Sequence, residues 1–253
     1  MQISSKELRH MASDVDDMHH EAMRTFAEET AELHLTAARR SRRSFVQKAG
    51  LAGVGGALLS AGGGFLPFGN LVGVAGAQGL TDTIIAGYAQ SVELAAVAAY
   101  TAAAAALKGD TLEVAKLFLS HHQQHADAFG NVAGDDARPE ANPKLLAAVK
   151  PSLDAVAAAV KAGKDASGDA LEFARNLENQ AAYTYAAALT ALSDPAYAAA
   201  TSTILPIEAQ HATVLAVALG KGPEDLFPTG AFEAAVFGDG TDTKAGLDPA
   251  VFA

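Results

Sequence analysis

The sequence contains no cysteine, which excludes disulfide bonds, iron–sulfur clusters and thiol catalysis. It is also poor in basic residues, since 18 Lys and Arg against 29 Asp and Glu give a net charge of −11. In residues 78–253 the basic residues form no cluster, which argues against nucleic acid and anionic membranes as partners. Strand patterns are nearly absent, whereas alanine, the best helix former, dominates the periodic segments. The composition therefore predicts an acidic, all-α protein.

Residues 1–77 have the features of an export leader. Ser41-Arg42-Arg43-Ser44-Phe45-Val46-Gln47 resembles the twin-arginine signal S-R-R-x-F-L-K, and a weakly apolar, glycine-rich stretch follows over 49–74. It ends in Ala75-Gly76-Ala77, the small-residue pattern that a signal peptidase accepts. The alternative, a membrane anchor, requires about 20 apolar residues, and this stretch is too rich in glycine. We predict cleavage after residue 77, export by the twin-arginine translocase to the periplasm, cell envelope or medium, and no membrane span after cleavage.

The first 40 residues of this leader alternate acidic, basic and apolar positions. Residues 16–21 read Asp-Asp-Met-His-His-Glu, a set of side chains that binds metal ions when it is folded suitably. A solvated helical face is the simpler interpretation, and we expect these side chains to be exposed.

Periodicity and helix breakers predict four long helices in residues 78–222, over 81–107, 111–129, 168–192 and 195–219. Residues 131–142 are expected to be a loop, because glycine, proline and aspartate cluster there. Two short helices over 143–149 and 152–162 would then cross between the halves. Residues 223–253 contain four phenylalanines with little periodicity, and we expect an irregular tail that packs these rings over the bundle.

The most informative pattern is a pair of matching half-sites. Two glutamates that lie 85 residues apart each precede a tyrosine by seven positions, and two x-x-His pairs lie 86 residues apart. Positions three apart lie on one side of a helix, so each pair directs two side chains the same way. A di-metal carboxylate site in a four-helix bundle needs a Glu from each of two helices and a Glu-x-x-His from each of the others. The six candidate metal ligands are Glu93, His122, His125, Glu178, Glu208 and His211.

Mixed carboxylate and imidazole ligands suit iron and manganese, whereas thiolates would indicate zinc or copper. Glu93 and Glu208 interrupt apolar runs, and a buried carboxylate needs a cation, a proton or a metal. The alternative is that these glutamates and histidines face solvent. His121 is expected to point away from His122 and His125 and to be exposed. Tyr100 and Tyr185, on the glutamate faces of their helices, are expected to be core residues that hydrogen-bond a neighbour rather than redox-active groups.

The duplicated pattern resembles the ferritin-like superfamily, and within it the exported bacterial ferritin-like-domain proteins that are similar to plant desiccation-related proteins. The resemblance covers residues 80–220 and implies an all-α, ferritin-like four-helix bundle with a long crossover between helices two and three. It also implies the role of each ligand by position. Glu93 and Glu178 would be terminal carboxylates, Glu208 a bridge between two ions, and His125 and His211 one imidazole for each ion.

The first half-site departs from the family pattern, because His122 stands where a second bridging glutamate is expected. An imidazole bonds only one metal through its available nitrogen, so the departure favours a weakened, mononuclear or asymmetric centre. A degenerate bundle without metal is the further alternative.

Two functions from different classes follow. The first is a metal-dependent redox protein that binds one or two iron or manganese ions per chain and reacts with oxygen or peroxide. The second is a non-catalytic envelope or stress-protection protein that kept the bundle and lost the metal site. Both functions are compatible with a homo-oligomer.

Overall fold

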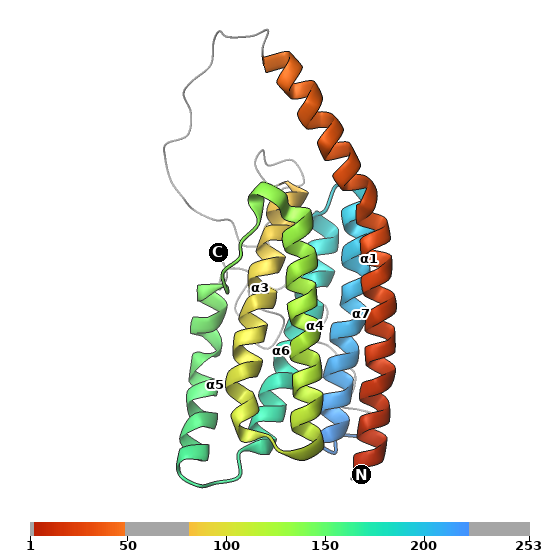
Figure 1. The fold of residues 1–253 in the computed structure, drawn as a ribbon. Coiled ribbons are helices and arrows are strands. Elements are labelled where there is room, and N and C mark those ends of the chain that lie inside the picture. Colours follow the sequence, from red (N-terminus) through yellow and green to blue (C-terminus); the bar gives the residue numbers. More distant parts are fainter. Residues whose placement is uncertain (1–2, 49–80, 223–253) are drawn as a thin grey trace.

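The computed structural model describes residues 3–48 and 81–222, which form helices and no strand within those ranges (Figure 1). The confirmed all-α fold consists of α1 (Ser5–Lys48), α3 (Asp82–Ala103), α4 (Gly109–Ala133), α5 (Pro143–Lys161), α6 (Ser167–Ala191) and α7 (Pro195–Ala218). Single-turn 3-10 helices follow α3 and α4, at Ala104–Ala106 and Gly134–Asp136. Among these helices of the described ranges, none is sufficiently long and apolar to cross a membrane.

Four helices form the central bundle. α3 packs on α4, α6 packs on α7, and α3 also contacts α6. Two further helices cover this bundle from outside: α1 lies beside α4 and α7, and α5 lies on the opposite side, beside α3 (Figure 1). The crossover between the two halves of the bundle is thus α5.

The helix starts follow their capping residues. Thr81 Oγ1 accepts a hydrogen bond from the Ile84 N–H at 3.2 Å, which caps α3. Asp194 caps α7 by accepting from the Ala196 N–H at 3.0 Å, and Pro195 takes the first helical position, where no N–H is needed. These starts agree with the sequence prediction to within a residue.

Two predicted helix ends are wrong. α4 continues to Ala133 rather than ending at residue 129, because Gly130 serves close packing: a Cβ there would lie 2.2 Å from Gln90 Nε2. The helix ends at Gly134 instead, whose φ of +58° suits a residue without a side chain. The two short crossover helices are one helix, α5, which continues through Pro151. The proline removes one backbone hydrogen bond, but alanines on both sides favour the helix.

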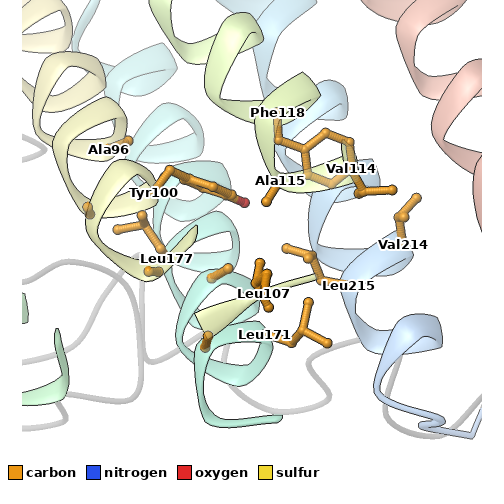
Figure 2. Close-up of a cluster of buried hydrophobic side chains, with 14 of the residues drawn as sticks. Ala96, Tyr100, Leu107, Val114, Ala115, Phe118, Leu171, Leu177, Val214 and Leu215 are labelled. Atoms are coloured by element: carbon orange, nitrogen blue, oxygen red, sulfur yellow. The ribbon is translucent and has the colours of Figure 1, made fainter. Parts of the chain in front are cut away.

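Apolar side chains fill the bundle in two clusters, one on each side of a polar layer. Along α4, for example, Phe118 belongs to the first cluster and Phe129 to the second, with three histidines between them. Figure 2 shows side chains of the first cluster converging from the bundle helices, among them Phe118, Leu171 and Leu215. Tyr185 and Ile204 belong to the second cluster. The polar layer is therefore enclosed along the bundle axis.

The close approach of α3 to the turn after α4 depends on Gly87. A Cβ at this position would lie 2.0 Å from the backbone oxygen of Asp136. We expect Gly87→Ala to lower the free energy of unfolding by about 1–3 kcal/mol through overpacking, measured by urea denaturation. Gly168 in the first turn of α6 is the matched control, because a Cβ there meets nothing within 4 Å. Gly168→Ala should leave stability unchanged or raise it by about 0.5–1 kcal/mol. Equal effects at the two positions would contradict the close packing at Gly87.

α1 packs against α4 and α7, although residues 1–77 read as a leader apart from the bundle. Its buried residues form one helical stripe: Leu8, Ala12, Val15, His19, Ala22, Phe26 and Thr30. The Phe26 ring meets the Phe129 ring edge-to-face with centroids 5.4 Å apart. The expectation that residues 16–21 are exposed is therefore wrong for His19, which lies on this stripe, four residues after Val15.

The structure describes only part of the predicted leader and tail. The twin-arginine pair, Arg42-Arg43, is described and lies within the span of α1. The glycine-rich stretch 49–74, the predicted cleavage site after Ala77 and the tail 223–253 lie outside the described residues. Export and the three-part division at residues 77 and 222 stay predictions.

Candidate metal centre

The structure brings all six predicted ligands together in the polar layer. Glu93 comes from α3, His122 and His125 from α4, Glu178 from α6, and Glu208 and His211 from α7. Each of these side chains is at most 2 % exposed. The alternative that they face solvent is therefore wrong.

The six residues form two overlapping groups of four. The first consists of Glu93, His122, His125 and Glu208, and the second of His122, Glu178, Glu208 and His211. Within each group, one ligand atom per residue lies within 4.8 Å of the others. Glu208 and His122 belong to both groups, so they occupy the positions between two sites.

In the first group, the carboxylates surround two histidines of α4. His122 Nδ1 donates a hydrogen bond to Glu93 Oε2 at 2.7 Å. His125 Nδ1 lies 2.9 Å from Glu208 Oε1 and 3.6 Å from Glu93 Oε1. One turn of α4 thus offers both imidazoles to two carboxylates, as the i, i+3 spacing requires.

The second group repeats this arrangement around Glu178. His122 Nε2 donates to Glu178 Oε1 at 3.1 Å. His211 Nδ1 lies 3.3 Å from Glu178 Oε2 and 3.4 Å from Glu208 Oε2. Glu208 therefore directs one oxygen to each group, Oε1 to His125 and Oε2 to His211.

Two tyrosines hold the terminal glutamates, and their hydrogen bonds cross between the halves. The Tyr100 hydroxyl on α3 donates to Glu178 Oε1 on α6, and the Tyr185 hydroxyl on α6 donates to Glu93 Oε1 on α3. Burial and the nearby carboxylates raise the pKa of both hydroxyls well above the usual value, so both remain donors. This confirms that the tyrosines are core residues bonded to a neighbour.

In this layer, burial and the attraction between opposite charges shift the pKa values of the side chains in opposite directions. Burial alone would raise the pKa of Glu93, but the His122 and His125 rings lower it to about 2. Burial alone would lower the pKa of His125, but the Glu208 and Glu93 carboxylates raise it to about 9. The pKa of His122 is likewise raised, despite burial, by Glu178, Glu208 and Glu93. Carboxylates and imidazolium ions thus stabilise each other here, and a metal ion must displace protons from the imidazoles.

The residues fit a metal centre because several buried ligand atoms lack a hydrogen bond. Glu208 Oε1 and Oε2 and both ring nitrogens of His125 are buried and make no hydrogen bond within the described part of the chain. Burying such atoms without a partner is costly. The Glu208–His125 pair lies within ion-pair distance without the orientation of a hydrogen bond. A cation between these atoms would satisfy them, and the oxygen and nitrogen donors suit iron or manganese.

His121 corrects one expectation, because it is fully buried instead of exposed. It lies about 100° around α4 from His122, on the face that α1 covers, and it contacts His211 of the six ligands. His121 Nε2 donates to Asp16 Oδ1 at 3.1 Å, and His121 Nδ1 lies 2.9 Å from His211 Nε2. If His121 is neutral, its Nδ1 accepts from His211 Nε2–H, which leaves His211 Nδ1 free to face the six-residue set.

The sequence did not predict that Asp16 and His19 of α1 contact His121 beside the six ligands. The available signal was the apolar spacing of residues 8–26, which places His19 on the buried stripe and Asp16 beside it. Residues 1–77 were instead predicted to be a leader that takes no part in the bundle.

Comparison with known proteins agrees with the architecture. A family model described as a ferritin-like domain matches residues 81–221, the region that contains all six candidate ligands. No curated protein and no solved structure matches the chain.

Proposed function

Because the chain belongs to the family of ferritin-like domains, we propose that it binds one or two iron or manganese ions in the buried set of six residues. One observation carries the proposal: Glu208 is shared by both groups, and neither of its buried oxygens has a hydrogen-bond partner among the residues that the structure describes. Glu208 would bridge two ions, and Glu93 with His125, and Glu178 with His211, would hold one ion each.

The metal, when bound, would supply redox chemistry toward oxygen or peroxide. The chain's own residues prepare the site for that chemistry. Tyr100 and Tyr185 orient Glu178 and Glu93 through their hydroxyls. The apolar clusters on both sides exclude water, which strengthens the electrostatic interactions inside. These features support a reactive centre in a dry, enclosed layer.

The proposal is tested by elemental analysis of the full chain purified without chelators, followed by peroxide and oxygen consumption assays. Two irons or manganeses per chain, with consumption above that of the metal-free protein, support the dinuclear redox centre. One ion per chain means that His122 has reduced the centre to a single site. No iron or manganese, even after anaerobic reconstitution, would refute metal-dependent function.

His122 favours a second candidate, a non-catalytic bundle of an envelope or stress-protection protein. Its two ring nitrogens lie at 2.7 Å from Glu93 and 3.1 Å from Glu178, so both carry hydrogens and the ring is an imidazolium ion. This positive charge connects the two terminal carboxylates without any metal. Thermal unfolding discriminates the two candidates: added iron or manganese raises Tm if the set binds metal, and leaves it unchanged if the ion pairs are purely structural.

The motif Ser41-Arg42-Arg43 supports the further proposal that the protein is exported by the twin-arginine translocase. We expect the double substitution Arg42→Lys and Arg43→Lys to retain the chain in the cytoplasm, because the motif is read as an arginine pair. Cell fractionation with immunoblotting measures this, and Lys48→Arg is the control that leaves the pair intact. Equal export of the double variant and the parent would exclude this route.

A further inference from the structure

We propose that Asp16, His19 and His121 form a separate site for a zinc-like divalent cation, at the interface of α1 and α4. One ligand atom of each residue lies within 4.8 Å of the others. The site uses none of the six candidate ligands, although its His121 contacts His211 of that set. Asp16 and His19 belong to residues 1–77, so the site is a property of the uncleaved chain.

The strongest observation is His19. Its side chain is fully buried, and neither ring nitrogen has a hydrogen-bond partner among residues 3–48 and 81–222. An unsatisfied buried imidazole is costly, whereas an imidazole bound to a cation has its partner.

The second observation is the position of the His121 ring. It stacks on the His19 ring with centroids 3.8 Å apart and planes at 9°, and one nitrogen of each ring lies within 4.8 Å of the other. The torsion that rotates a histidine ring is broad, so a modest turn directs both lone pairs to one ion. His121 Nδ1 lies 2.9 Å from His211 Nε2. When Nε2 of His121 binds the cation, the ring hydrogen is on Nδ1 and is donated to His211 Nε2.

Asp16 supplies the negative charge and the access. Its side chain is 35 % exposed, and its Oδ1 lies 3.1 Å from His121 Nε2 and 3.3 Å from His20 Nδ1. Asp16, His19 and His20 follow one another at positions i, i+3 and i+4 of α1, a spacing that places them on neighbouring faces of the helix. Two imidazoles, one carboxylate and a fourth position open to water match the donor set of zinc sites.

The experiment is a calorimetric titration of the metal-free full chain with Zn²⁺. His19→Phe keeps an aromatic ring against His121 and removes both nitrogens, and it should lower the number of bound Zn²⁺ by one per chain. Asp16→Asn, a milder change at a partly exposed residue, should weaken the same site at least tenfold. His10→Phe is the matched control, because His10 pairs with Asp14 at 3.6 Å on the exposed side of the same helix.

The result that would overturn the proposal is equal Zn²⁺ stoichiometry and affinity in the parent, His19→Phe and Asp16→Asn. Circular dichroism establishes whether each variant is folded. If His19→Phe is not folded, the Zn²⁺ titration of Asp16→Asn decides whether the site exists. Repeating the comparison in a Glu208→Gln background separates the two sites. A Zn²⁺ lost on Glu208→Gln belongs to the buried set, and one lost on His19→Phe belongs to the site at α1.

Discussion

Replacing Glu208 by glutamine is expected to remove both metal ions from the buried set, because one carboxylate serves both groups of ligands. The amide has nearly the same size, so the packing of α7 is retained while the bridging charge is lost. We expect iron or manganese content to fall from its parental value to near zero, measured by elemental analysis after reconstitution and gel filtration.

Two comparisons make this expectation specific. Glu93→Gln should release only the ion of the first group, because Glu93 does not belong to the second. Glu113→Gln, on the exposed side of α4 where Glu113 pairs with Lys116, should change nothing. If Glu208→Gln retained the parental metal content, the assignment of Glu208 as the shared ligand would be wrong.

Phe26→Ala is expected to lower the free energy of unfolding of the full chain by about 3–5 kcal/mol, the usual cost of deleting a buried phenylalanine. Phe26 is 3 % exposed and contacts Phe129 of the second apolar cluster, so its removal leaves a cavity between α1 and the bundle. Urea denaturation followed by circular dichroism measures the change.

Met18→Ala on the same helix is the control for Phe26→Ala. Met18 is 43 % exposed, and a surface substitution of this kind changes stability by about 0.5 kcal/mol or less. Alanine is a better helix former than either residue, so helix propensity does not account for a loss of stability in either variant. Equal effects of the two substitutions would show that α1 does not pack on the bundle in solution.

The bundle and the six ligands were predictable because their signals are local and repeated. Alanine-rich periodicity marks the long helices, and i, i+3 spacing places His122 with His125, and Glu208 with His211, on single faces. The internal duplication then paired each glutamate with its histidines without any knowledge of the packing.

The end of α4, the burial of His121 and the packing of α1 were not predicted, because they depend on contacts between residues distant in the sequence. Gly130 resembles a helix stop, and only the position of Gln90 explains why α4 continues through it. His121 was expected to be exposed because it lies about 100° around the helix from His122. That reasoning is correct for four helices, but α1 covers the remaining face. The stripe from Leu8 to Phe26 was visible in the sequence, yet a glycine-rich segment after an arginine pair favoured a leader.

The burial of the six ligands has a consequence for the rate at which the centre fills. An ion in solvent reaches them only when helices move apart, so loading should follow the opening rate of the structure rather than the strength of binding. A chain of contacts from the partly exposed Asp16 through His121 reaches His211 of the set, between α1, α4 and α7. Opening of α1 would therefore set the pace of metal uptake, and a chain with a loosened α1 should load faster than its parent.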